Sequence, residues 1–60
     1  MKLHECFPGS AVKVLSKGQF KIGQIISVDS ATKCVNIKFT DNPTKTVTYD
    51  EKKLEKVWWA

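Results

Sequence analysis

The chain contains no arginine, since all ten of its basic residues are lysine. Arginine supplies a planar fork that recognises guanine edges and clamps phosphates in a fixed geometry, whereas lysine supplies a mobile point charge. The formal net charge is +4. The composition therefore predicts diffuse attraction to charged partners rather than recognition of a base sequence.

Cysteine, histidine and long apolar stretches are also scarce. The two cysteines, Cys6 and Cys34, and the single histidine cannot complete a tetrahedral zinc site. We expect no metal and no cofactor, and free thiols in a reducing compartment. The N-terminus lacks the apolar core of a signal peptide, and no stretch approaches the about 20 apolar residues of a membrane span. We therefore expect a soluble, intracellular chain without a membrane partner.

A chain of 60 residues has room for one small domain. We expect residues 1–8 to form a flexible N-terminal segment and residues 9–58 to form the domain. The consecutive residues His4, Glu5 and Cys6 offer a base, an acid and a nucleophile, but neighbours in an extended segment cannot converge on one atom. We therefore expect no catalytic residues and a non-catalytic role.

The strongest structural signal runs from Phe20 to Asp41 and predicts a β-hairpin. The polar stretch 29–33 predicts its turn. In the strand before this turn, Ile25 and Val28 are three positions apart, so both can face the core only if a bulge bends the strand. In the strand after it, apolar residues occupy every second position, as in a half-buried strand: Val35, Ile37 and Phe39.

Three shorter strands are expected at residues 11–15, 45–49 and 55–58. Turn-forming residues separate them, and residues 50–54 can close one helical turn. The side chains expected to face inward are Val12, Val14, Val47, Tyr49 and Leu54. Together with the hairpin, this pattern predicts an all-β fold, a five-stranded SH3-like barrel with one short helical turn before the last strand.

The order and spacing of these residues resemble a Tudor domain. Two segments carry most of the resemblance, QIISVD at 24–29 and CVNIKFTD at 34–41, and single positions add to it: Gly9, Val12, Gly18, Phe20 and Leu54. Tudor domains bind methylated lysine or arginine in a cage of aromatic rings. The resemblance implies a nuclear protein associated with chromatin or RNA, a protein tail such as a histone tail as partner, and these ligand-binding residues: Phe20, Lys21, Phe39 and Asp41.

The cage itself is incomplete in this chain. The family's cage positions fall on Leu15, Lys21, Phe39 and the stretch 42–45, and only Phe39 is aromatic. A lysine at the second position repels a cationic ligand. The resemblance therefore implies the fold and a docking surface, but not the recognition of a methylated residue.

Nucleic-acid binding is the alternative. The segments PGSAVKV at 8–14, GQF at 18–20 and LEKV at 54–57, with Gly23, resemble the KOW modules that contact RNA or ribosome and polymerase partners. Phe20 is a candidate for base stacking, or else covers one mouth of the barrel. Outward-facing and loop lysines would bind phosphates weakly, without sequence preference and with strong salt dependence: Lys13, Lys17, Lys21, Lys38 and Lys45.

The pair Trp58 and Trp59 is expected in the last strand. Adjacent residues of a strand point to opposite faces, so one of the two rings should be exposed. This ring either shields the outer face of the barrel or anchors a partner or a second copy of the chain. The sequence leaves the oligomeric state open.

Overall fold

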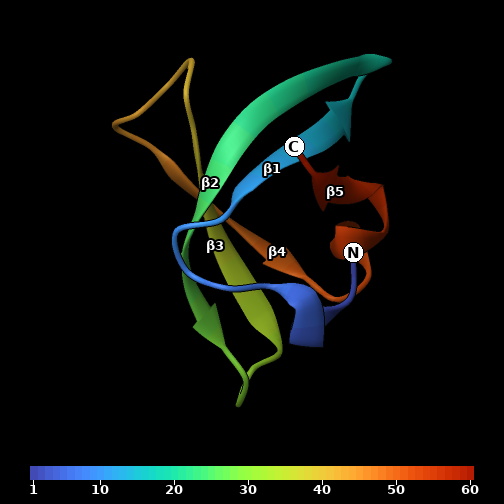
Figure 1. Ribbon diagram of the computed structural model, residues 1–60, viewed down its shortest axis with the longest axis vertical. Helices are drawn as coiled ribbons and strands as arrows, with labels where there is room; N and C mark the ends of the chain where they lie inside the picture. The colour runs from blue at the N-terminus through green and yellow to red at the C-terminus, as the bar shows by residue number, and fades with distance from the viewer.

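The computed structural model describes residues 1–60 and contains one antiparallel sheet of five strands (Figure 1). The strands are β1 (Ala11–Ser16), β2 (Gln19–Asp29), β3 (Cys34–Phe39), β4 (Thr46–Asp50) and β5 (Val57–Trp59). Two short 3-10 helices, η1 (Leu3–Glu5) and η2 (Lys53–Lys56), precede β1 and β5. The all-β class and the helical turn before the last strand are confirmed, although η2 and β5 begin later than predicted. Neither helical segment has the length or apolar character needed to cross a membrane.

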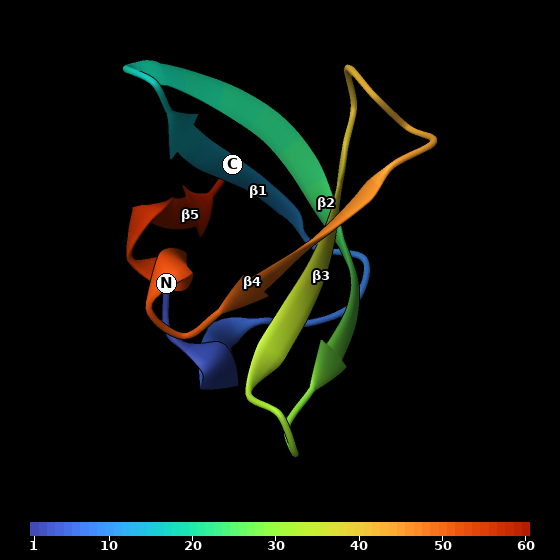
Figure 2. The same cartoon turned by 180° about the vertical axis from the view of Figure 1, so that it is seen from behind.

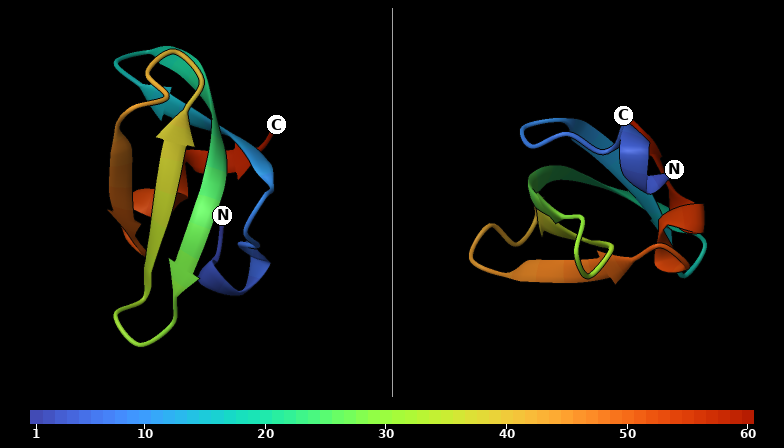
Figure 3. Two further views of the ribbon diagram at one scale, coloured as in Figure 1. Left: turned by 90° about the vertical axis from the view of Figure 1, so that its left-hand side faces the viewer. Right: turned by 90° about the horizontal axis from the view of Figure 1, so that it is seen from below.

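The sheet is curled but not closed into a barrel. Its strand order is β4-β3-β2-β1-β5, so β4 and β5 are its two edges. Figure 3 shows the sheet folding over on itself, with β1 and β5 on one side of the interior and β3 and β4 on the other. The helix η2 contacts β1, β4 and β5 and thus lies where the two edges approach each other.

A bulge in β2 produces much of this curl. The register of β2 with β3 shifts between Ile25 and Ser27, as the spacing of Ile25 and Val28 predicted. Ile25 is fully buried and Val28 packs against the core. Figure 2 shows the long β2 running past β1 at one end and beside β3 at the other.

Gly23 allows β2 to approach β3 closely. A Cβ atom at this position would lie 2.9 Å from Ile37 Cγ2 and 3.1 Å from the carbonyl oxygen of Lys38. The glycine therefore leaves the space that the buried Ile37 side chain fills.

The core is small, as expected for a chain of this length. It contains eight buried residues: Cys6, Val12, Val14, Ile25, Val35, Ile37, Leu54 and Val57. The inward orientation of Val12, Val14 and Leu54 is thereby confirmed. Val47 and Tyr49 are half-buried.

The N-terminal segment contributes to this core, which the sequence did not predict. Cys6 is only 5% exposed. The α-amino group of Met1 donates hydrogen bonds to the carbonyl oxygens of Leu54 and Val57, both at 2.8 Å. The segment for which we expected flexibility is thus joined to η2 and the start of β5, and the N-terminus lies beside η2 in Figures 1 and 2.

Both tryptophan rings are exposed, whereas the alternation of strand faces predicted only one. Val57 is the residue of β5 that enters the core. Trp58 faces outward, on the face of its partner Lys13. Trp59 shares the face of Val57 but ends the short edge strand, and it is left 46% exposed.

Candidate ligand-binding surface

The residues predicted to bind a ligand lie at the open end of the β2–β3 hairpin. Lys21 Nζ and Asp41 Oδ2 are 3.8 Å apart. The backbone N–H and the side-chain Oγ1 of Thr40 both donate to the carbonyl oxygen of Ile22, each at 3.1 Å. The structure therefore brings Lys21 and Asp41 together, as predicted, and fixes the loop after β3 against β2.

The β1–β2 turn and the β3–β4 loop lie at this same end of the molecule (Figures 1 and 3). Gly18 in the turn has a φ of +77°, a conformation that glycine adopts readily. Lys17 also has a positive φ, +51°, which was not predicted. The β1–β2 turn and the β3–β4 loop therefore border this end of the fold, which is called here the mouth.

Phe39 packs near a second ring on the inner side of the sheet. Phe39 and Tyr49 are neighbours in an edge-to-face arrangement, with ring centroids 6.4 Å apart. Both are half-buried and pack against the core, as the predicted inward orientation of Tyr49 implied. Burial raises the pKa of the Tyr49 hydroxyl. Phe39 was the only aromatic residue at the cage positions of the Tudor resemblance, and the structure adds Tyr49 beside it.

Tyr49 also lines a cleft of about 370 Å³ between the end of β1 and η2. Its apolar lining comes from Val14, Leu15 and Tyr49, and Ser16 adds a hydroxyl. Its charged lining comes from the segment around η2: Lys52, Lys53, Glu55 and Lys56. Three lysines against one glutamate make the cleft basic.

Two acidic residues just before η2 make contacts of their own. The Asp50 carboxylate accepts a hydrogen bond from the backbone N–H of Lys53 at 2.9 Å. Glu51 lies 3.9 Å from Lys33 Nζ. The lysines in and beside η2 were not among the predicted site residues, although the stretch KKLEK at 52–56 shows them in the sequence.

Phe20 does not belong to the same site as Lys21, Phe39 and Asp41. Successive residues of a strand face opposite sides of a sheet, and Lys21 shares the face of its partner Val14. Phe20 is therefore on the outer face. Its ring lies 5.7 Å from that of Trp58, and Lys13 Nζ lies 5.3 Å from its centre. The four predicted ligand residues are thus divided between two faces.

The lysines predicted to bind nucleic acid are divided in the same way. Lys13 and Lys38 face outward from β1 and β3. Lys17 lies in the β1–β2 turn and Lys45 in the β3–β4 loop, whereas Lys21 is paired with Asp41. No single face carries all five lysines, because side chains alternate between the two faces of a strand and two of the lysines lie in loops.

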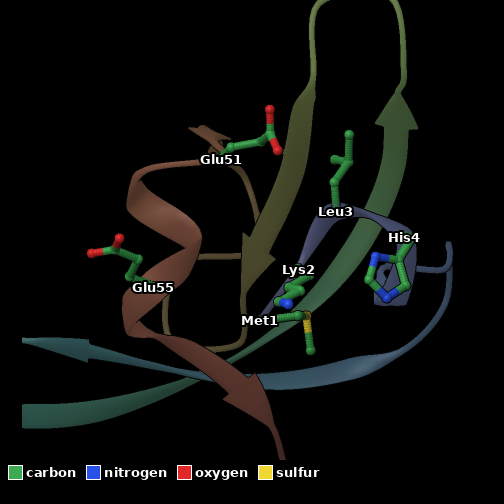
Figure 4. Close-up of a pocket in the computed structure, with 6 residues that line it drawn as sticks. All are labelled: Met1, Lys2, Leu3, His4, Glu51 and Glu55. Atoms are coloured by element: carbon green, nitrogen blue, oxygen red, sulfur yellow. The ribbon is translucent and has the colours of Figure 1, made fainter.

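The N-terminal segment and η2 enclose another hollow, of about 510 Å³ (Figure 4). Its lining combines Lys2 and His4 with Glu51 and Glu55. In Figure 4 the carboxylates of Glu51 and Glu55 point away from each other, and His4 lies on the far side of the hollow. No group of three or more metal-ligating side chains gathers here or elsewhere in the structure. Although this hollow is the largest, its polar groups do not converge, so the candidate site is the mouth together with the cleft that Tyr49 lines.

The side chains of Glu5 and Cys6 both contact the backbone of Lys2. The Glu5 carboxylate accepts a hydrogen bond from the Lys2 backbone N–H at 2.9 Å, which lowers its pKa. The Cys6 thiol donates to the Lys2 carbonyl oxygen at 3.5 Å, and burial raises its pKa. A buried thiol with a raised pKa is a poor nucleophile, because the thiolate is the reactive form. Both cysteines are free.

Comparisons with protein-family models, with curated proteins and with solved structures find no match. The assignment of a function therefore depends on the side chains of the mouth, the cleft and the outer face.

Proposed function

We propose that this protein is a non-catalytic binding module of Tudor type, in a protein associated with chromatin or RNA, that docks an extended protein tail at the mouth of its curled sheet. Lys21, Phe39 and Asp41 form one wall of the site. Tyr49 connects them to the basic cleft beside η2, which holds the rest of the tail.

The arrangement of the strands supports an SH3-like barrel as the framework. The order β4-β3-β2-β1-β5, the bulged β2 and the helical turn between β4 and β5 are features of that architecture. Here η2 occupies the gap between the edge strands. Fold alone does not define a ligand, so the partner is argued from the side chains.

The single observation that carries the choice of partner is the basic lining of a cleft with an aromatic and aliphatic floor. Lys52, Lys53 and Lys56 attract carboxylates, while Val14 and Tyr49 offer apolar contact. A methylated lysine or arginine needs several rings around its cation. Only Phe39 and Tyr49 meet here, and Lys21 repels a cation. The preferred tail is therefore acidic, with apolar residues between its carboxylates.

Fluorescence anisotropy with labelled peptides tests this proposal. The probe is a twelve-residue peptide with alternating glutamate and leucine, and its matched control carries glutamine in place of every glutamate. A third peptide carries trimethyllysine in a basic sequence. We expect binding of the acidic peptide only, weakened about tenfold in the variant Lys53→Gln/Lys56→Gln, since each exposed ionic contact contributes up to about 1 kcal/mol.

The variant Lys33→Gln, which changes a lysine outside the cleft, is the control and should bind normally. Equal binding of the acidic and glutamine peptides would contradict the proposal. Preferential binding of the trimethyllysine peptide would restore the recognition of methylated residues as the function.

A further inference from the structure

The outer face of the sheet carries four neighbouring residues that the core does not use: Lys13, Phe20, Ile22 and Trp58, called here the aromatic strip. Lys13 of β1 pairs with Ile22 of β2 on one side and with Trp58 of β5 on the other. The rings of Phe20 and Trp58 meet edge to face across β1, with the Lys13 ammonium near Phe20. Residues nearly forty positions apart in the sequence therefore form one surface.

The aromatic strip is open to solvent. Phe20 is 56% exposed, Ile22 46% and Trp58 39%. Single exposed apolar residues are ordinary on protein surfaces, but neighbouring ones commonly mark a contact site. The two exposed rings also lie outside the tail site, because they are on the opposite face of the sheet from Phe39 and Tyr49.

The other half of the outer face carries a row of hydrogen-bonded polar side chains. There Asn36 donates through Nδ2 to Ser27 Oγ at 2.8 Å, and Thr48 donates through Oγ1 to Asn36 Oδ1 at 2.8 Å. This chain of hydrogen bonds joins β2, β3 and β4 and satisfies its own polar groups. The outer face therefore has two parts, one with the exposed rings and one with the hydrogen-bonded polar network.

The charge around the aromatic strip is positive. The residues that face outward in this half include Lys13 and Lys38 and no acidic residue. Outward-facing acidic residues, Asp29 and Asp50, lie at the opposite end of the sheet, on either side of Cys34. Lys38 and Gln24 also line a hollow of about 300 Å³, whose other lining residues are Phe39, Thr40 and Pro43.

We propose that the aromatic strip binds single-stranded nucleic acid without sequence preference, with bases stacked on Phe20 and Trp58 and phosphates against Lys13 and Lys38. Exposed aromatic rings stack on the faces of bases, and these faces are accessible only in unpaired strands. Lysine attracts phosphate as a point charge and does not select a base. A second copy of the chain is a poorer occupant, because it would bring like-charged lysines together.

Anisotropy of labelled twelve-residue oligothymidylate and oligouridylate tests the proposal. Both should bind equally, because stacking and phosphate contact do not use the 2′-hydroxyl. Raising the salt from about 50 to about 200 mM should weaken binding about sevenfold if two phosphates are contacted. A duplex of the same length should bind more weakly than either single strand.

Matched variants locate the site. Phe20→Ala and Trp58→Ala should each weaken binding at least fivefold, the lower end of measured losses for stacked bases. Phe7→Ala removes an equally exposed ring outside the sheet and should have no effect. The variant Trp59→Phe keeps Trp58, and the oligonucleotide should quench its fluorescence. The variant Trp58→Phe keeps Trp59, and its fluorescence should not be quenched. Thermal unfolding checks that each variant is folded.

Several results would overturn the proposal. These are an absence of binding at low salt, equal affinity for the duplex, a preference of more than tenfold between the two oligonucleotides, or equal losses from Phe7→Ala and Phe20→Ala. Self-association that Trp58→Ala abolishes, seen by sedimentation, would assign the surface to a second copy instead. If the acidic peptide does not bind, this test is unaffected, because the proposed tail-binding site contains none of the residues varied here.

Discussion

Lys21 and Asp41 form an ion pair, 3.8 Å from Nζ to Oδ2, that connects the beginning of β2 to the loop after β3. Both side chains are about half exposed. Removal of either by alanine substitution should therefore lower the free energy of unfolding by less than about 1 kcal/mol.

A double-mutant cycle measures this ion pair directly. The coupling energy should be about 0.2–1 kcal/mol and should fall as salt is added. A coupling above about 2 kcal/mol that is insensitive to salt would show that the pair is more enclosed than its exposure indicates.

Gly23→Ala tests the close approach of β2 and β3. The added methyl group would meet Ile37 Cγ2 at 2.9 Å, and Ile37 is fully buried. We expect the free energy of unfolding to fall by about 1–3 kcal/mol, measured by chemical denaturation. Lys38→Thr, an outward substitution nearby, should change it by no more than about 0.5 kcal/mol. Equal stability of Gly23→Ala and the unsubstituted chain would disprove the contact.

The two cysteines should react with a thiol reagent at very different rates. Cys6 is buried with a raised pKa, whereas Cys34 is half-buried. In the native protein one thiol should therefore be labelled rapidly, and in Cys34→Ser this rapid phase should disappear. Denaturant should expose the second thiol. Rapid labelling of Cys6 in the native Cys34→Ser variant would mean that the N-terminal segment does not protect it.

Stability should fall at alkaline pH partly because of Tyr49. Burial raises its pKa in the folded state above the value of about 10 in the unfolded chain. Its contribution is complete below the unfolded pKa and is lost as the pH rises through the folded pKa.

Tyr49 is the only tyrosine, so the absorbance of tyrosinate reports its titration without interference from another phenol. The variant Tyr49→Phe keeps the lysines that also titrate in this range, and it should lose less stability between neutral and alkaline pH. Parallel losses in the two proteins would exclude a contribution from Tyr49.

Much of the fold follows from local sequence patterns. Period-two alternation correctly placed Val35 and Ile37 in the core, and the three-residue spacing of Ile25 and Val28 correctly predicted the bulge. These features depend on neighbours within one hairpin. The burial of Cys6 could not be predicted in this way, because the short N-terminal segment has no period and its contacts are with η2, at the other end of the chain.

The candidate sites were predicted less completely for a related reason. The meeting of Lys21 and Asp41 follows from the hairpin, so the sequence was sufficient. The separation of Phe20 from Phe39 follows from the alternation of side chains along a strand. The prediction of one common site did not take this alternation into account. The contact between Phe20 and Trp58 depends on β5 pairing beside β1. The cleft that Tyr49 shares with the η2 lysines depends on the curl of the whole sheet.

The most direct test of the central claim is a titration of the isotope-labelled chain with the acidic peptide, followed by the amide resonances. We predict shifts concentrated at Val14, Leu15, Tyr49 and the η2 lysines, with smaller shifts at Lys21 and Phe39. The glutamine control peptide should leave them unchanged. Shifts confined to the outer face around Phe20 and Trp58, or no shifts at all, would contradict the assignment of a tail-binding site to the mouth and its basic cleft.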